Sequence, residues 1–123
     1  MPTVMIVDDI EGIRQIVARI LEQQGYTTIC VSSGHEALAT LGTVGPDLIL
    51  LDVMMPEMDG LDCLAALRRD PRGRQTPIIM MSALCDQHHR DRARALGADE
   101  YLVKSHFTVD DLLEQVNRCM SRN

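Results

Sequence analysis

The chain has 123 residues and a mass of 13.7 kDa, the size of one ordinary domain. Hydrophobic residues make up 46% and charged residues 24%, and the apolar runs are only strand-length, which excludes a membrane-spanning helix. A net charge of −6 with no Trp, one Phe and two Tyr argues against nucleic-acid binding, which needs cations and stacking rings.

The cysteines and the start of the chain suggest a location. No basic and apolar leader opens the sequence, so we expect a cytoplasmic protein rather than a secreted one. The four cysteines show no metal-binding spacing. We therefore expect reduced thiols that pack as small apolar groups.

Short apolar runs alternate with segments of helical periodicity. In chain order, we expect a strand at 3–7, a helix at 10–21, a strand at 27–31, a helix at 33–41, a strand at 47–51, a helix at 61–69, a strand at 77–81, a helix at 86–96, a strand at 101–103 and a helix at 108–120. Ser33 with Glu36 has the form of a capping box, and Thr108 is a second N-cap.

This alternation predicts an α/β fold. Five strand-helix units favour a doubly wound parallel sheet of five strands, with five helices on both faces and right-handed crossovers. No internal linker or repeat interrupts the chain, so we expect one domain over residues 1–123, without an output domain. A basic run of Arg68, Arg69, Arg72 and Arg74 is interpreted as a solvated face, with a partner contact as the alternative.

Polar residues directly follow four of the five predicted strands. They are Asp8 and Asp9, then Asp52, then Ser82, and finally Lys104, the only lysine. Ligands of open α/β sheets bind at the carboxyl ends of strands, so these side chains form a candidate site. Three carboxylates that share a site repel one another unless a cation joins them, and oxygen ligands suit Mg²⁺. For Asp8 and Asp9, helix capping alone is the simpler alternative.

Four segments carry a resemblance to a known family. They are IVDD at 6–9, DLILLDVMMPEMDG at 47–60, PIIMMSA at 77–83 and GADEYLVK at 97–104. Together they resemble the receiver domain of bacterial two-component response regulators, nearly end to end. The resemblance implies the strand order 2-1-3-4-5, which brings the strands before Asp8 and Asp52 side by side.

The same resemblance implies a phosphorylation switch that depends on Mg²⁺. Asp52 would accept a phosphoryl group from the phosphohistidine of a sensor histidine kinase or phosphotransfer protein. Asp9, Asp52 and the backbone carbonyl of Met54 would bind Mg²⁺ directly, and Asp8 would act mostly through water. Ser82 and Lys104 would contact phosphoryl oxygens.

The expected readout is a change of surface. Ser82 would draw in the loop that follows it, and Tyr101 would then turn inward. The face formed by the fourth helix, fifth strand and fifth helix would change shape for an unnamed protein target or a phosphorylation-linked dimer. The protein would be a switch with limited self-phosphorylation and self-dephosphorylation, not a turnover enzyme. Tyr101 as a plain half-buried strand aromatic, and Ser82 as a turn hydroxyl, are the alternatives.

Three positions depart from the family pattern or flank the reactive site. Ser105 follows Lys104 where the family usually has a cis-proline, and a cis bond before a non-proline residue costs about 3–4 kcal/mol, so we expect a trans bond and a displaced loop. Met54 and Leu84 are apolar, and neither can orient a water molecule. We therefore expect slow loss of an aspartyl phosphate.

Three other functions compete with the switch. An FMN-binding protein would need a phosphate cradle after the first strand, where Asp8 and Asp9 would repel the phosphate. A dehalogenase-type phosphatase would need a second Asp at the position of Met54. A receiver-like interaction module that is never phosphorylated is the remaining alternative, and Ser105 keeps it open.

Overall fold

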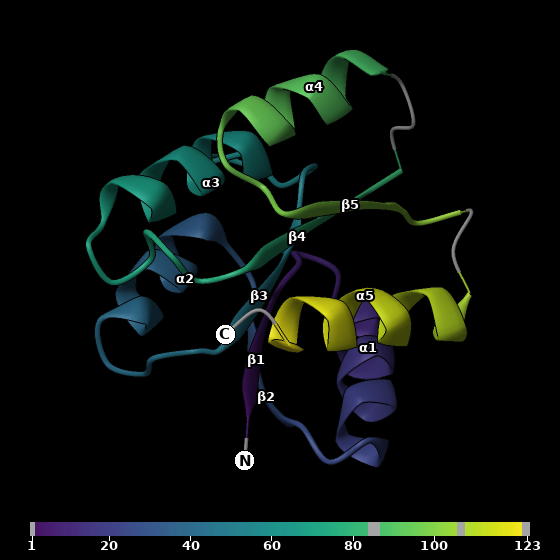
Figure 1. The fold of residues 1–123 in the computed structure, drawn as a ribbon. Coiled ribbons are helices and arrows are strands. Elements are labelled where there is room, and N and C mark those ends of the chain that lie inside the picture. Colours follow the sequence, from purple (N-terminus) through teal and green to yellow (C-terminus); the bar gives the residue numbers. More distant parts are fainter. Residues whose placement is uncertain (1, 84–86, 106–107, 122–123) are drawn as a thin grey trace.

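A computed structural model of the protein describes residues 2–83, 87–105 and 108–121. Ten elements alternate along this chain (Figure 1). They are β1 (Thr3–Val7), α1 (Glu11–Gln23), β2 (Thr27–Val31), α2 (Gly34–Leu41), β3 (Leu48–Asp52), α3 (Gly60–Arg69), β4 (Ile78–Ser82), α4 (Gln87–Ala95), β5 (Glu100–Val103) and α5 (Val109–Ser121). Among the described residues, no helix combines the length and the apolar character that crossing a bilayer requires.

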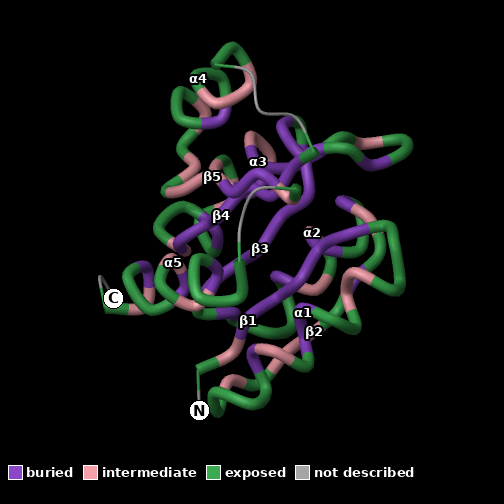
Figure 2. Tube along the Cα trace, turned by 90° about the vertical axis from the view of Figure 1, so that its right-hand side faces the viewer, coloured by how far each residue is buried: buried purple, intermediate pink, exposed green. Residues whose placement is uncertain are grey.

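The strands form one parallel sheet in the order β2-β1-β3-β4-β5, which confirms the expected topology. Helices cover both faces, and the sheet runs through the molecule as its buried layer (Figures 1 and 2). Because side chains alternate along a strand, β1 contributes side chains to two hydrophobic cores, one on each face of the sheet. Met5 and Val7 pack with α2, α3 and α4, whereas Val4 and Ile6 pack with α1 and α5.

Two strands begin and end one residue later than predicted. Asp47 lies just before β3, where its carboxylate accepts a hydrogen bond from the backbone N–H of Thr3 at 2.8 Å. At the other end, Val53 N–H donates to the carbonyl of Met81 at 2.9 Å, so pairing continues through Asp52. β4 is shifted in the same way and includes Ser82. The shift places both polar residues within the rigid sheet.

The predicted helix caps are present. The Ser33 side chain accepts the Glu36 N–H at 3.1 Å, and the Thr108 side chain accepts the Asp111 N–H at 3.1 Å. At α1 and α3 the helix start differs by one residue from the prediction. α1 begins after Ile10, which is the N-cap residue and is 51% exposed, and α3 begins at Gly60. The expectation of packed thiols holds for Cys63 and Cys119 but not for Cys30, which is exposed on the edge strand β2.

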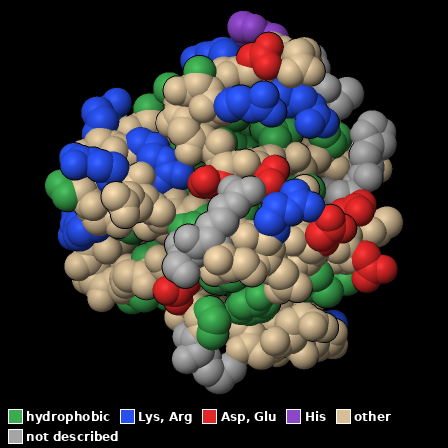
Figure 3. Space-filling view, in the orientation of Figure 1, with side chains coloured by type: hydrophobic (Ala, Val, Ile, Leu, Met, Phe, Trp, Pro, Cys, Tyr) green, Lys and Arg blue, Asp and Glu red, His purple; other side chains and the backbone are tan. Residues whose placement is uncertain are grey.

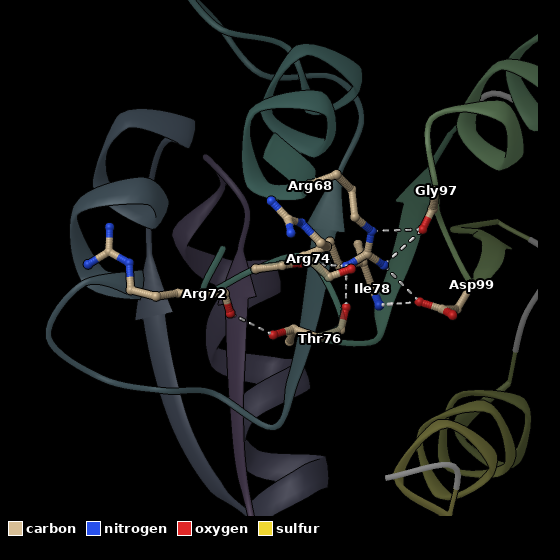
Figure 4. Close-up of polar contacts among 8 residues, drawn as sticks. Arg68, Arg72, Arg74, Thr76, Ile78, Gly97 and Asp99 are labelled. Carbon is tan, nitrogen blue, oxygen red and sulfur yellow. Dashed lines mark hydrogen bonds and ion pairs between the residues drawn. The ribbon is translucent and has the colours of Figure 1, made fainter. Parts of the chain in front are cut away.

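The basic run is only partly a solvated face. Arg69, Arg72 and Arg74 are exposed, and Lys and Arg side chains gather over α3 and α4 in the space-filling view (Figure 3). The Arg68 side chain, in contrast, is only 17% exposed. It donates to the carbonyls of Gly97, Gly73 and Thr76 at 2.6–3.0 Å and pairs with Asp99 at 3.0 Å (Figure 4). Arg68 therefore joins the loop between α3 and β4 to the loop between α4 and β5.

Candidate functional site

The carboxyl ends of β1, β3 and β5 bring two acids and a lysine together. Asp8 and Asp52 are buried, with 0% and 2% of their surfaces exposed. Lys104 Nζ lies 2.9 Å from Asp8 Oδ2 and 3.1 Å from Asp52 Oδ1. The hydrogen bond from Lys104 to Asp8, which joins residues 96 positions apart, was not predicted.

The Asp52 carboxylate is held in an unfavourable environment for a charge. Burial, and then the neighbouring Asp8 carboxylate, raise the pKa of Asp52 from 3.8 to about 6, although Lys104 opposes the rise. The Lys104 ammonium touches Oδ1 without the alignment of a hydrogen bond, so within the described chain this buried oxygen has no hydrogen-bond partner. Such an oxygen, which Lys104 contacts only as an ion pair, can accept a further cation.

Lys104 keeps its charge in this setting. Burial lowers the pKa of Lys104, but the hydrogen bond to Asp8 and the charges of Asp52 and Asp8 outweigh burial, so the pKa lies above its ordinary value. The lysine therefore remains an ammonium at neutral pH. It neutralises one of the two buried carboxylates and leaves a net negative site.

Asp9 completes a group of donors that fits a divalent cation. Asp8, Asp9 and Asp52 each offer a carboxylate oxygen, and these oxygens lie within 4.8 Å of one another. Asp9 is exposed, so one side of the group is open to water. Hard oxygen donors with room for water suit Mg²⁺, and the Asp52 oxygen, which has no hydrogen-bond partner in the described chain, agrees with such a ligand. The residues present could therefore hold a metal ion.

Met54 follows β3 and borders this group. Its backbone N–H forms a hydrogen bond that lowers the pKa of Asp52, and its side chain is 58% exposed. The carbonyl of Val53 accepts a hydrogen bond from Gly60 N–H at 2.7 Å, which closes the loop. A Cβ on Gly60 would lie 2.1 Å from the Asp52 carbonyl, so only glycine fits against the end of β3.

Ser82 and Tyr101, the two expected switch residues, lie on neighbouring strands. Ser82 ends β4 fully buried, and its carbonyl accepts the Lys104 N–H at 2.7 Å. Tyr101 lies on β5, partly buried against the core, with the Arg90 guanidinium 5.2 Å from its ring centroid. Ala83 is exposed, whereas residues 84–86, which include Leu84, lie outside the described part.

Comparisons with known proteins decide the family. The family model for the response regulator receiver domain matches residues 4–117. The chain belongs to the response regulator receiver family. Receiver domains act as signalling switches between histidine kinases or phosphotransfer proteins and downstream targets.

Individual relatives agree with this assignment. The chain is 35% identical over 122 residues to the DNA-binding dual master transcriptional regulator RpaA of Synechocystis, matching 99% of this chain and 50% of that protein. It resembles the chemotaxis protein CheY4 of Vibrio cholerae with a TM-score of 0.91 and 34% identity, over 97% and 98% of the two chains.

A third relative was solved with a metal ion. The response regulator TrrA of Thermotoga maritima, in complex with Mg²⁺-BeF, gives a TM-score of 0.85 and 32% identity over 97% and 99% of the two chains. The receiver described here spans half or less of the first curated relatives it matches, at 50%, 45% and 25% of their lengths.

Two features of this receiver site differ from or add to the sequence analysis. The Lys104–Ser105 bond is trans, as expected, since the described residues contain no cis peptide bond. Arg14 was not predicted: its Nη1 donates to the backbone carbonyl of Asp8 at 2.6 Å. An arginine in the second turn of a helix carries no local signal of this contact, because solvent-facing arginines occur at the same spacing.

Proposed function

We propose that this receiver accepts a phosphoryl group on Asp52, in a reaction that depends on Mg²⁺. The observation that carries the proposal is the buried Asp52 oxygen, which lacks a hydrogen-bond partner in the described chain and lies between Lys104 and two further carboxylates. The donor is the phosphohistidine of a sensor kinase or phosphotransfer protein. The cytoplasmic location expected from the sequence stays a prediction.

The residues divide the work of the transfer among them. An Asp52 oxygen attacks phosphorus, the phosphorus–nitrogen bond of the donor breaks, and an acyl phosphate forms. Asp9, Asp52 and the Met54 carbonyl would hold Mg²⁺, with Asp8 acting through water. When bound, Mg²⁺ neutralises charge between the carboxylate and the incoming phosphoryl group. Lys104 leaves its contact with Asp52 and pairs with a phosphoryl oxygen.

The switch follows from the same contacts. The Ser82 hydroxyl turns toward the phosphoryl group and draws the loop after β4 with it. Tyr101 then leaves Arg90 and turns inward, so the α4-β5-α5 face changes shape for its partner. Since Lys104 N–H is bonded to the Ser82 carbonyl, the two phosphate-contacting residues move on linked strands.

Labelling with acetyl phosphate tests the transfer. Incorporation of phosphate should require Mg²⁺ and should disappear in Asp52→Asn. A matched control is Asp110→Asn, which removes an exposed carboxylate from the first turn of α5. A folded protein that takes up no phosphate would contradict the proposal and favour an unphosphorylated interaction module.

Tyrosine fluorescence tests the switch. The chain has no Trp and two Tyr, so Tyr26→Phe leaves Tyr101 as the only emitter. Phosphorylation should change its emission, and Ser82→Ala should abolish the change while leaving Asp52 able to accept phosphate. An unchanged emission in a phosphorylated protein would mean that Tyr101 is only a packed strand residue.

A further inference from the structure

The turn between β1 and α1 carries two of the three acids, yet it lacks a side-chain cap. Ile10 is the N-cap residue of α1 and has no polar side chain. Asp8 takes over part of this task, because its Oδ1 accepts the Ile10 N–H at 2.9 Å. The backbone N–H of Asp8 donates to the Val31 carbonyl at 3.2 Å, so β2 holds the entry to the turn.

Arg14 contacts the backbone that follows Asp8. Its Nη1 donates a hydrogen bond of 2.6 Å to the Asp8 carbonyl, six residues back along the chain. A charged donor makes such a bond stronger than one between neutral groups. This carbonyl belongs to the peptide that joins Asp8 to Asp9. Its orientation therefore sets the direction in which Asp9 leaves the strand.

The guanidinium acts on the backbone rather than on the carboxylates. Within the described chain, Arg14 forms no ion pair with Asp8, Asp9 or Asp52, although Lys104 pairs with two of them. We propose that Arg14 is a positioning residue for the cation site: it fixes the Asp8–Asp9 peptide so that the Asp9 carboxylate faces Asp52. This inference rests on the proposed function.

Positioning and charge predict opposite results when Arg14 is replaced. A positive charge near a cation site repels the cation, so removing it should strengthen Mg²⁺ binding if charge were the whole effect. If Arg14 aims the acids, removing it should weaken binding. Partners that orient metal ligands typically contribute 10–100-fold to metal affinity.

Calorimetric titration with Mg²⁺ alone separates the two cases. Arg14→Met keeps the aliphatic stem and removes the donor, and we expect about tenfold weaker binding. The matched control is Arg19→Met, which removes the same charge from an exposed position of α1 and should change the affinity less than about twofold. Binding by Arg14→Met that equals or exceeds that of the wild-type protein would overturn the inference.

Two further measurements make the result decisive. Circular dichroism and urea unfolding in EDTA establish that Arg14→Met is folded. If it is not, Arg14→Lys replaces it, keeping the charge with a single donor point; a loss of affinity supports positioning and wild-type affinity overturns it. A wild-type protein that binds no Mg²⁺ would contradict the proposed function itself, whereas equal binding by wild type and variant would contradict the role of Arg14 alone.

Discussion

Met54 exposes an apolar side chain beside the carboxylate that we propose as the phosphoacceptor. The side chain is 58% exposed, and Met54 stands two residues after Asp52 in the chain. A thioether neither donates nor strongly accepts hydrogen bonds and cannot orient a water molecule for hydrolysis of an acyl phosphate on Asp52. Slow hydrolysis is the consequence we expect from this one side chain.

Replacing Met54 with asparagine should therefore speed the loss of phosphate severalfold, because the amide can hold a water molecule near phosphorus. The rate is measured by the decay of labelled protein after the phosphodonor is removed. Val44→Asn is the matched control, since Val44 is another exposed apolar residue, at 37% exposure, outside the site. Equal rates in all three proteins would show that Met54 only packs the loop. Leu84, the second residue of this hypothesis, lies outside the described residues.

At the level of single residues, the sequence predicted which residue types form the candidate site better than it predicted which side chains contact one another. The acids and the lysine could be predicted because each follows an apolar run, and parallel strands bring such positions to one edge. The Lys104–Asp8 bond and the Arg14–Asp8 bond could not, since both depend on the distance between side chains after folding. Aspartates that follow a strand also give no sign of which oxygen remains without a partner.

At the scale of elements, the contact of α3 with β3 depends on Gly60. Gly60→Ala would place a Cβ 2.1 Å from the Asp52 carbonyl and 2.6 Å from Val53 Cα, so backbone must move. We expect a loss of about 1–3 kcal/mol in the free energy of unfolding, measured with urea, and weaker phosphorylation of Asp52.

Gly12→Ala is the control, because nothing lies within 4 Å of a Cβ at that position of α1. It should be neutral or stabilise the protein by up to about 1 kcal/mol, as alanine favours helix. Similar stability of the two variants would mean that the β3–α3 loop adapts without strain.

Arg68 connects the end of α3 to the α3–β4 loop and to the α4–β5 loop. Arg68→Ala should lower the free energy of unfolding by about 2–4 kcal/mol, because several backbone carbonyls lose a charged donor. Arg69→Ala, at the next, exposed position, should stay within about 0.5 kcal/mol of the wild-type protein. Urea unfolding of both variants checks the contrast, and equal losses would contradict it.

Element boundaries were predictable to within one or two residues where capping chemistry is local. Ser33 and Thr108 show this, since each bonds a backbone N–H three residues ahead. The start of α1 at Glu11 was missed because Ile10 fits the apolar spacing but lies at the exposed N-cap. The role of Arg68 was missed because Gly97 and Asp99 are 29 and 31 residues away.

At the scale of the whole molecule, a buried acid makes folding depend on pH. The pKa of Asp52 is raised to about 6 from 3.8, so between these values the folded state binds more protons than the unfolded state. The free energy of unfolding should therefore fall as pH rises from about 4 to about 6. At neutral pH it should remain at this lower value.

Asp52→Asn should remove this pH dependence and stabilise the metal-free protein at pH 7, by about 1–2 kcal/mol once solvent screening is allowed for. Urea unfolding at several pH values in EDTA measures it, with Asp110→Asn as a control that keeps the slope. If the stability of the wild-type protein does not fall between pH about 4 and about 6, the raised pKa of Asp52 is contradicted.

The fold class followed from the alternation of strands and helices, because a parallel sheet covered on both faces buries five apolar strands joined by amphipathic helices. The strand order came from the family resemblance rather than from periodicity, which contains no information on which strands are neighbours.

The ion pairs of Lys104 with two carboxylates also allow the site to be probed by chemical modification. No other side chain of the sequence carries a primary amine, so a reagent selective for amines modifies one side chain, which is Lys104 in its ion pairs with Asp8 and Asp52. Ion pairing slows acylation by keeping the amine protonated. In the purified protein, the rate of lysine modification therefore reports whether Lys104 is paired at this site, without any engineered reporter.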